Sequence, residues 1–137
     1  MKPLQFAIGL LVTLASLSLY AQTIDARANI PFEFRVGEKL MPAGEYSIRH
    51  SASWLAVQEN GGHHASAVTL THATDLPADI KPDKLVLQFN RYGDTYFLGK
   101  LSIPGSDRAR EVPKTPREKE LARRNSPGQT TVAFDSK

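Results

Sequence analysis

The sequence contains no cysteine among its 137 residues. This absence excludes disulfide bonds, thiolate metal ligands, nucleophilic thiols and covalent haem attachment. It also excludes a bacterial lipoprotein anchor, which forms on a cysteine. The folded protein must therefore be stabilised by its apolar core alone.

The sequence also lacks the motifs that announce common chemistries. G-x-S-x-G, H-E-x-x-H, a phosphate-binding loop and a dinucleotide-binding loop are all missing. The aspartates at 75, 79 and 83 are too widely spaced for a calcium loop. Adjacent His63 and His64 would point to opposite faces of a strand, and His50 and His72 stand alone. We therefore predict no catalytic residue, no metal site and no cofactor.

The net charge is small and positive, +3 from 17 Lys and Arg against 14 Asp and Glu. Such a charge permits weak association with anionic surfaces. No basic platform interleaved with aromatic residues is present, so nucleic acid is not an expected partner.

The N-terminus has the three-part layout of a secretory signal peptide. Met1 and Lys2 provide a positive start, residues 6–19 are almost wholly apolar, and Ala21 supplies a small residue before Gln22. We predict a signal peptide over residues 1–21 and a periplasmic or extracellular location, with no stable membrane insertion after cleavage. The alternatives are cleavage near Ala28 and an uncleaved anchor, although the apolar run is shorter than the ~20 residues that span a bilayer.

The sequence pattern after the signal peptide predicts a β-rich domain over residues 22–104. Ile30, Phe32, Phe34 and Val36 alternate with polar residues, which is typical of a strand with one buried face. Pro31 cannot donate a ladder hydrogen bond, which favours an edge position or an unpaired N–H there. Short strands separated by turns, without alternating helices, predict an all-β fold: a small antiparallel β-sandwich or barrel of six to seven strands.

Three hairpins are expected along this domain. Pro42 and Gly44 favour a three-residue hairpin loop, after which Tyr46 and Ile48 point inward. Asn60-Gly61-Gly62 predicts a turn, but a two-residue and a three-residue loop give opposite registers, and the choice stays open. For the last hairpin, a loop of residues 91–93 with Gly93 in the left-handed conformation would pair Leu87 with Phe97 and Leu85 with Gly99.

A basic segment over residues 105–137 follows the predicted domain. Thr115-Pro116-Arg117-Glu118 is a capping box with proline at the first helical position, and it predicts a helix over residues 116–123. So short a helix must lean on the domain or fray. Residues 130–134 are either a short final strand or part of a disordered tail.

Three stretches together resemble a family of short exported proteins that is abundant in acidobacterial genomes. They are N-I-P-F-E-F-R-V-G followed by P-A-G-E-Y, then R-Y-G-D-T-Y-F-L, and finally V-P-K-T-P-R-E-K-E-L-A. The P-A-G-x-Y turn is also similar to turns in transthyretin-like sandwich modules. No activity attaches to these motifs, so the resemblance implies a fold and no chemistry.

The best candidate for a binding site is the tip of the last predicted hairpin. Arg91, Tyr92, Asp94 and Tyr96 suit contact with sugars or acidic groups, and Trp54 is a further aromatic candidate. A purely structural role explains the same residues, because glycine and aspartate are favoured in tight turns and the two tyrosines can pack across strands.

We therefore expect a non-enzymatic binding or structural module that contacts an envelope glycan or protein. The alternatives are a small secreted hydrolase with an unrecognised carboxylate or histidine site, and an assembly subunit with an open edge at the Pro31 strand.

Overall fold

The computed structural model describes residues 26–62, 64–76 and 83–136. The predicted signal peptide, His63 and Asp79 lie outside these residues. The elements are β1 (Ala26–Ile30), β2 (Phe34–Val36), β3 (Lys39–Met41), β4 (Gly44–His50), β5 (Trp54–Glu59), β6 (Ser66–Leu70), β7 (His72–Asp75), β8 (Leu85–Tyr92), β9 (Thr95–Ser102), β10 (Arg108–Glu111), α1 (Pro116–Arg124) and β11 (Gly128–Ser136).

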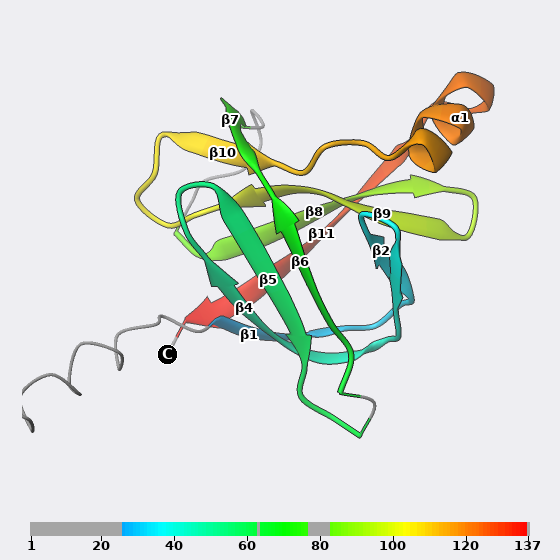
Figure 1. Ribbon diagram of the computed structural model, residues 1–137. Helices are drawn as coiled ribbons and strands as arrows, with labels where there is room; N and C mark the ends of the chain where they lie inside the picture. Colours follow the sequence, from blue (N-terminus) through cyan, green and yellow to red (C-terminus); the bar gives the residue numbers. More distant parts are fainter. Residues whose placement is uncertain (1–25, 63, 77–82, 137) are drawn as a thin grey trace, which may run out of the picture.

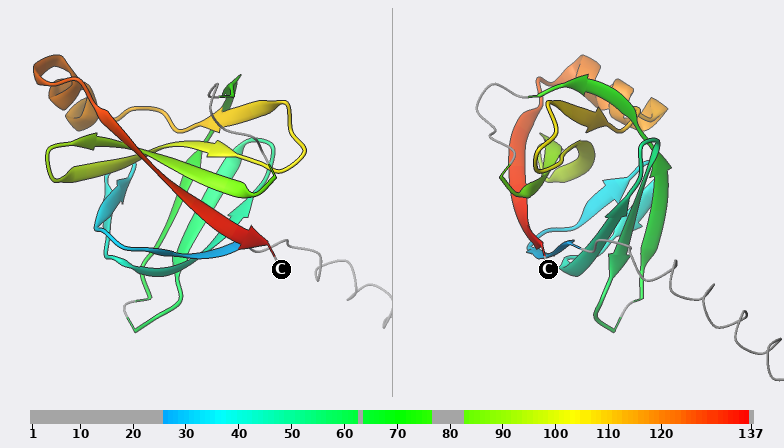
Figure 2. Two further views of the ribbon diagram at one scale, coloured as in Figure 1. Left: turned by 180° about the vertical axis from the view of Figure 1, so that it is seen from behind. Right: turned by 90° about the vertical axis from the view of Figure 1, so that its left-hand side faces the viewer.

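The strands form two sheets that enclose one core (Figures 1 and 2). The four-stranded sheet has the order β1-β4-β5-β6. The seven-stranded sheet contains β3-β2-β9-β8-β11, with β10 also paired to β9 and β7 paired to β10. Pairing of β1 with β11 joins the sheets along one side, without closing a barrel. The predicted all-β fold with a short C-terminal helix is confirmed, with more strands than expected because several runs are interrupted.

Two of these interruptions carry the chain from one sheet to the other. At Pro31 the first alternating run breaks, so that β1 lies in the small sheet and β2 in the large one. At Thr71 the edge strand β6 continues as β7, and the Thr71 hydroxyl and carbonyl oxygens accept hydrogen bonds from Arg110 at 3.3 and 3.2 Å. Strands that change sheets in this way form the corners of a two-sheet fold.

The run around Pro31 is not at an edge, because β1 lies between β11 and β4 and β2 lies between β3 and β9. The open edge that an assembly subunit would have used there is therefore absent. Alternation itself is confirmed: Ile30, Phe34 and Val36 are buried, and Phe32 packs against the same core.

Aromatic rings fill the centre of the core. Phe34 contacts Phe89 and Tyr46 with ring centroids 5.3 and 5.1 Å apart, and Phe32 meets Phe89 at 5.0 Å. All three contacts are edge-to-face, the arrangement that ring quadrupoles favour. Tyr46 is fully buried, and its hydroxyl donates to the carbonyl oxygen of Pro42 at 2.5 Å.

The predicted hairpin at Pro42-Ala43-Gly44 is wrong. The chain reverses earlier, at Gly37 and Glu38, where Gly37 has a φ of +61° and Val36 pairs with Lys39. β3 therefore pairs with β2, and β4 pairs with β1 instead. A glycine with positive φ at the first of two loop positions suits the right-handed twist of the flanking strands.

The loop between β5 and β6 is longer than either alternative considered from the sequence. Trp54 pairs with Leu70 and Gln58 with Ser66, and the Glu59 N–H donates to the Ala65 carbonyl oxygen at 2.7 Å, so the connection exceeds three residues. The buried Glu59 carboxylate holds this loop, accepting hydrogen bonds from the N–H groups of Gly61 at 2.7 Å and His64 at 3.0 Å. A side chain thus supplies the acceptors that a tight turn would take from its own backbone.

The predicted register of the last hairpin is also wrong, although Gly93 does have a positive φ of +63°. The loop contains only Gly93 and Asp94, and Tyr92 pairs with Thr95. Between the pairs Gln88–Lys100 and Phe89–Leu98, Gly99 is an extra residue on β9. This β-bulge shifts the register by one and sets Leu87 against Leu101, so the apolar faces coincide despite the even loop.

The final segment forms a strand. β11 pairs with β8 from Gly128–Arg91 to Phe134–Leu85, and it runs diagonally across the large sheet (Figure 1). The predicted helix is confirmed as α1, with the Thr115 hydroxyl accepting from the Glu118 N–H at 3.2 Å. Among the described residues, no helix combines the length and apolarity needed to cross a membrane.

Candidate functional site

The structure divides the five predicted site residues between two places. Arg91, Tyr92, Asp94 and Tyr96 lie at the end of the β8–β9 hairpin, beside the start of α1 (Figure 1). Trp54 lies on the other sheet, at the start of β5. The hairpin end alone is therefore a candidate site.

Tyr92 points into the fold rather than toward solvent. It is buried, and its hydroxyl donates to the Glu118 carboxylate at 2.9 Å. Asn90 donates to the same carboxylate oxygen at 2.9 Å. Burial raises the pKa of Tyr92 to about 12, with the hydrogen bond and the negative charge of Glu118 as further causes. Tyr92 thus anchors α1 to β8.

Tyr96 does not offer a free aromatic face. Phe32 stacks on its ring with centroids 4.0 Å apart and an interplanar angle of 17°. The Arg91 guanidinium lies over the same ring, 5.6 Å from its centroid, and also donates to the Gly93 carbonyl oxygen at 2.7 Å. Because Phe32 covers one face so closely, the guanidinium occupies the other. Stacking of a sugar on this ring, one of the uses that the sequence suggested, would need Arg91 to move.

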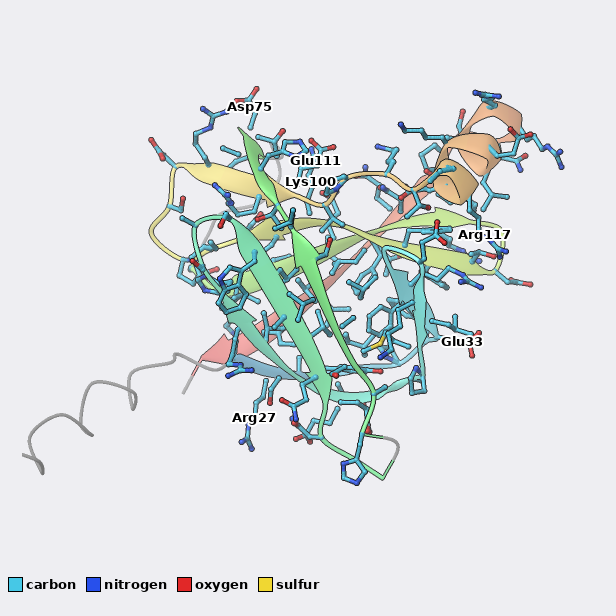
Figure 3. The ribbon with its side chains drawn as sticks, in the orientation of Figure 1. Arg27, Glu33, Asp75, Lys100, Glu111 and Arg117 are labelled. Carbon is cyan, nitrogen blue, oxygen red and sulfur yellow. The ribbon has the colours of Figure 1, made fainter. Side chains whose placement is uncertain are left out.

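A small pocket of about 110 Å³ opens beside Tyr96. The residues that line it come from three parts of the chain: Glu33, Phe34, Arg35, Leu40, Asp94, Thr95, Tyr96 and Arg117. Figure 3 shows Glu33 and Arg117 at the same end of the molecule. Whole-ligand sites usually measure roughly 300–1,000 Å³, so this pocket suits one small group of a larger partner.

Two long-range contacts assemble the pocket. β2 meets β9 in a single parallel bridge, Arg35–Phe97, which brings Glu33 and Arg35 beside Tyr96. The bonds from Asn90 and Tyr92 to Glu118 hold the first turn of α1 against β8, which places Arg117 over the pocket. Asp94 enters from the hairpin tip.

The pocket presents two guanidinium groups and two carboxylates. Arg35 donates to the Glu38 carbonyl oxygen at 3.2 Å. Within the part of the chain that the structure describes, Glu33, Asp94 and Arg117 form no ion pair and no side-chain hydrogen bond. The pocket can therefore receive an anionic group at its arginines and a cationic group at its carboxylates.

Of the five residues singled out from the sequence, Asp94 and Tyr96 line this pocket, and its further charged lining residues Glu33, Arg35 and Arg117 were not among the five. The outward positions of the first alternating run and the basic C-terminal segment were both visible signals. The local sequence pattern does not predict that β2 and the start of α1 both contact the β8–β9 hairpin, because these contacts join segments far apart in the chain.

The histidines that the structure describes, His50, His64 and His72, do not converge on a site. His50 is half-buried, and burial lowers its pKa below the usual value of 6.5. His72 lies 3.3 Å from Glu111 across the β7–β10 pair, and His64 lies in the β5–β6 loop. Among the described residues, no three His, Asp or Glu side chains gather closely enough to hold a metal ion.

Comparison with known proteins adds no assignment. No protein-family model matches the chain, and no curated protein sequence or solved structure shows significant similarity to it.

Proposed function

We propose that the protein is a non-enzymatic binding module of the cell envelope or exterior, and that it holds a small charged group of its partner in the hairpin-end pocket. The observation that carries this proposal is the pairing of two arginines with two carboxylates around a cavity of about 110 Å³, with Glu33, Asp94 and Arg117 not engaged by other described residues.

The composition of the pocket favours binding over hydrolysis. Glu33 and Asp94 are exposed, whereas a carboxyl group becomes a general acid when an apolar wall desolvates it. The residues lining the pocket include no histidine. Opposite charges set around a small cavity instead suit recognition of a partner that carries both signs, such as a short zwitterionic peptide.

The N-terminal pattern supports the exported location. A positive start, an apolar run and Ala21 before Gln22 together predict processing by a signal peptidase. Mass spectrometry of the protein recovered from the producing cell should show a chain that begins at Gln22. A chain that retains Met1 and Lys2 would contradict export with cleavage.

Glycylglycine is a suitable probe, because it carries one ammonium and one carboxylate group. In an NMR titration at low salt we expect weak binding, with Kd of about 1 mM, and amide shift changes confined to the neighbourhood of Asp94, Tyr96 and Arg117. N-acetylglycylglycine and glycylglycine amide each lack one charge and should bind several-fold more weakly.

Arg117→Ala and Asp94→Asn should both abolish the shift changes. Lys119→Ala is the matched control, since Lys119 is an exposed cation on the same helix but does not line the pocket. The proposal fails if glycylglycine leaves these amides unmoved, or if Lys119→Ala weakens binding as much as Arg117→Ala does. Cleavage of the dipeptide would support the hydrolase instead.

A further inference from the structure

A second surface, on the outer face of the small sheet, gathers the most exposed large apolar side chains among the described residues. Val68 and Leu70 on β6 are 72% and 71% exposed. Their partners on β5 are Ala56 and Trp54, which lie on the same outer face of the small sheet. Together these four residues form an apolar strip at one side of the molecule, which we call the β6 strip.

The backbone of β6 is also unpaired on one side. Glu59 N–H donates to the Ala65 carbonyl at 2.7 Å, and Thr71 N–H donates to the Ser53 carbonyl at 2.9 Å. Because antiparallel partners alternate, the odd-numbered residues of β6 bond to β5. The N–H and C=O groups of Ser66, Val68 and Leu70 therefore point away from β5, and no described strand pairs with them.

The two edge strands, β3 and β6, differ in their protection against pairing with a strand of another molecule. At the other end, β3 is only three residues long, contains Lys39 and is followed by Pro42. A short strand, an edge lysine and a proline are devices that prevent edge-to-edge pairing. β6 has none of these devices: Ser66–Leu70 contains no charge and no proline, and its pairing with β5 is regular throughout.

We propose that β6 is the dimer interface of this protein, pairing antiparallel with β6 of a second copy about a two-fold axis at Thr69. In this register Val68 of each copy lies opposite Leu70 of the other, so the exposed apolar side chains meet twice. In the same register, the outward-pointing backbone N–H and C=O groups of Val68 in one copy form hydrogen bonds with those of Leu70 in the other. A two-fold axis makes the same surface serve both partners.

The absence of charge on β6 favours a second copy as the partner. Two identical charged edges would repel each other, whereas Ser66–Leu70 carries no charge to oppose its own image. The pairing extends the small sheet from four strands to eight across the two molecules. Because five residues a side bury less than the roughly 1,200 Å² of a standard interface, the dimer is weak.

Sedimentation velocity of the protein, in the form that the producing cell accumulates, tests this inference. Over a range of about 1 µM to 1 mM, the wild type should pass from monomer to dimer and stop there. A wild type that stays monomeric overturns the proposal. That is the result expected if β6 instead pairs with a strand of a different protein. Growth beyond a dimer also overturns it, since a two-fold interface closes on itself.

Two variants separate strand pairing from simple apolar adhesion. Val68→Lys should remain monomeric throughout, because it sets a charge against Leu70 of the partner. Val68→Pro removes only an outward-pointing N–H, so the β5–β6 ladder survives while the dimer is lost. Ala133→Lys is the control: Ala133 is exposed on β11 and does not line the pocket, and this variant should dimerise as the wild type does.

Circular dichroism melts should show that all three variants fold. If folded Val68→Pro still dimerises, the contact is not strand pairing and the proposal is wrong. The glycylglycine titration of the pocket is independent of these measurements, so either proposal can fail alone.

Discussion

At the scale of single residues, Glu118 links the helix to the sheet. It is 3% exposed, yet its side chain bonds to Asn90 and Tyr92 on β8 rather than to the backbone of its own helix. A buried carboxylate is tolerated only when hydrogen bonds replace its lost hydration. The two donors on β8 provide that replacement.

Tyr92→Phe should therefore destabilise the protein more than a surface change would. Loss of the hydroxyl leaves the buried Glu118 carboxylate with one of its two β8 donors, and a hydrogen bond to a charged group contributes about 1.5–3 kcal/mol. Urea unfolding measures the loss. Tyr96→Phe is the matched control and should cost well under 1 kcal/mol, since the Tyr96 hydroxyl has no hydrogen-bond partner among the described residues.

Gly99 is the second residue on which the hairpin depends. A Cβ built there would lie 2.8 Å from the Asn90 amide nitrogen, which cannot move away without breaking its bond to Glu118. Gly99→Ala should therefore lower the free energy of unfolding by about 1–3 kcal/mol. Gly128→Ala is the control, because a Cβ there meets nothing closer than 3.9 Å. Equal melting temperatures for the two variants would contradict this account of the bulge.

At the scale of elements, α1 shows how a nine-residue helix can persist without an apolar face. Thr115 caps it, Pro116 begins it, and Arg123 and Arg124 in its last turn lie 3.3 Å from Glu120. Exposed pairs of this kind contribute little. The cap and the Glu118 anchor therefore decide whether the helix holds its place beside the pocket.

Thr115→Ala should weaken the helix start by about 1 kcal/mol, because the Glu118 N–H loses its acceptor. Hydrogen exchange at the first turn of α1 should accelerate together with this loss. Thr115→Ser keeps an acceptor and should exchange at nearly the wild-type rate. An unchanged exchange rate in Thr115→Ala would show that contacts with the sheet alone hold the helix.

At the scale of the whole molecule, two buried tyrosines make the free energy of unfolding decrease at alkaline pH. Desolvation raises the pKa of Tyr46 to about 12, with the negative charge of Glu59 as a second cause, and Tyr92 also reaches about 12. Since both values exceed the usual 10.0, the folded state holds these protons more tightly than the unfolded state does. The stabilisation is complete below pH 10 and is lost as the pH rises through about 12.

Unfolding free energies measured by urea titration should therefore fall between pH 10 and pH 12. The doubly substituted Tyr46→Phe, Tyr92→Phe protein, although less stable at neutral pH, should lose less over that interval. Tyrosinate absorbance reports the ionisation directly. If both proteins lose the same amount, other groups govern alkaline unfolding.

Much of the fold was predictable from local pattern. The alternation from Ile30 to Val36 predicted buried Ile30, Phe34 and Val36, with Phe32 partly buried. The capping box located α1 to within one residue at each end. These features depend on neighbours in the chain, where side-chain direction and backbone preference act directly. Strand pairing was not predictable in this way. The chain reverses after Gly37, so that β3 pairs with β2, although Pro42 and Gly44 are the residues that favour a turn in the sequence.

What the sequence determined by itself is which residues face the core, where the helix starts, and that the fold is built from strands. Which strands pair, the extra residue at Gly99 and the meeting of Glu33, Asp94 and Arg117 were decided by the tertiary structure. The physical reason is that the free energy of burying a side chain depends on its own polarity and hardly on which strand lies beside it. Register and pairing, in contrast, depend on the packing of distant segments against one another, which no local pattern encodes.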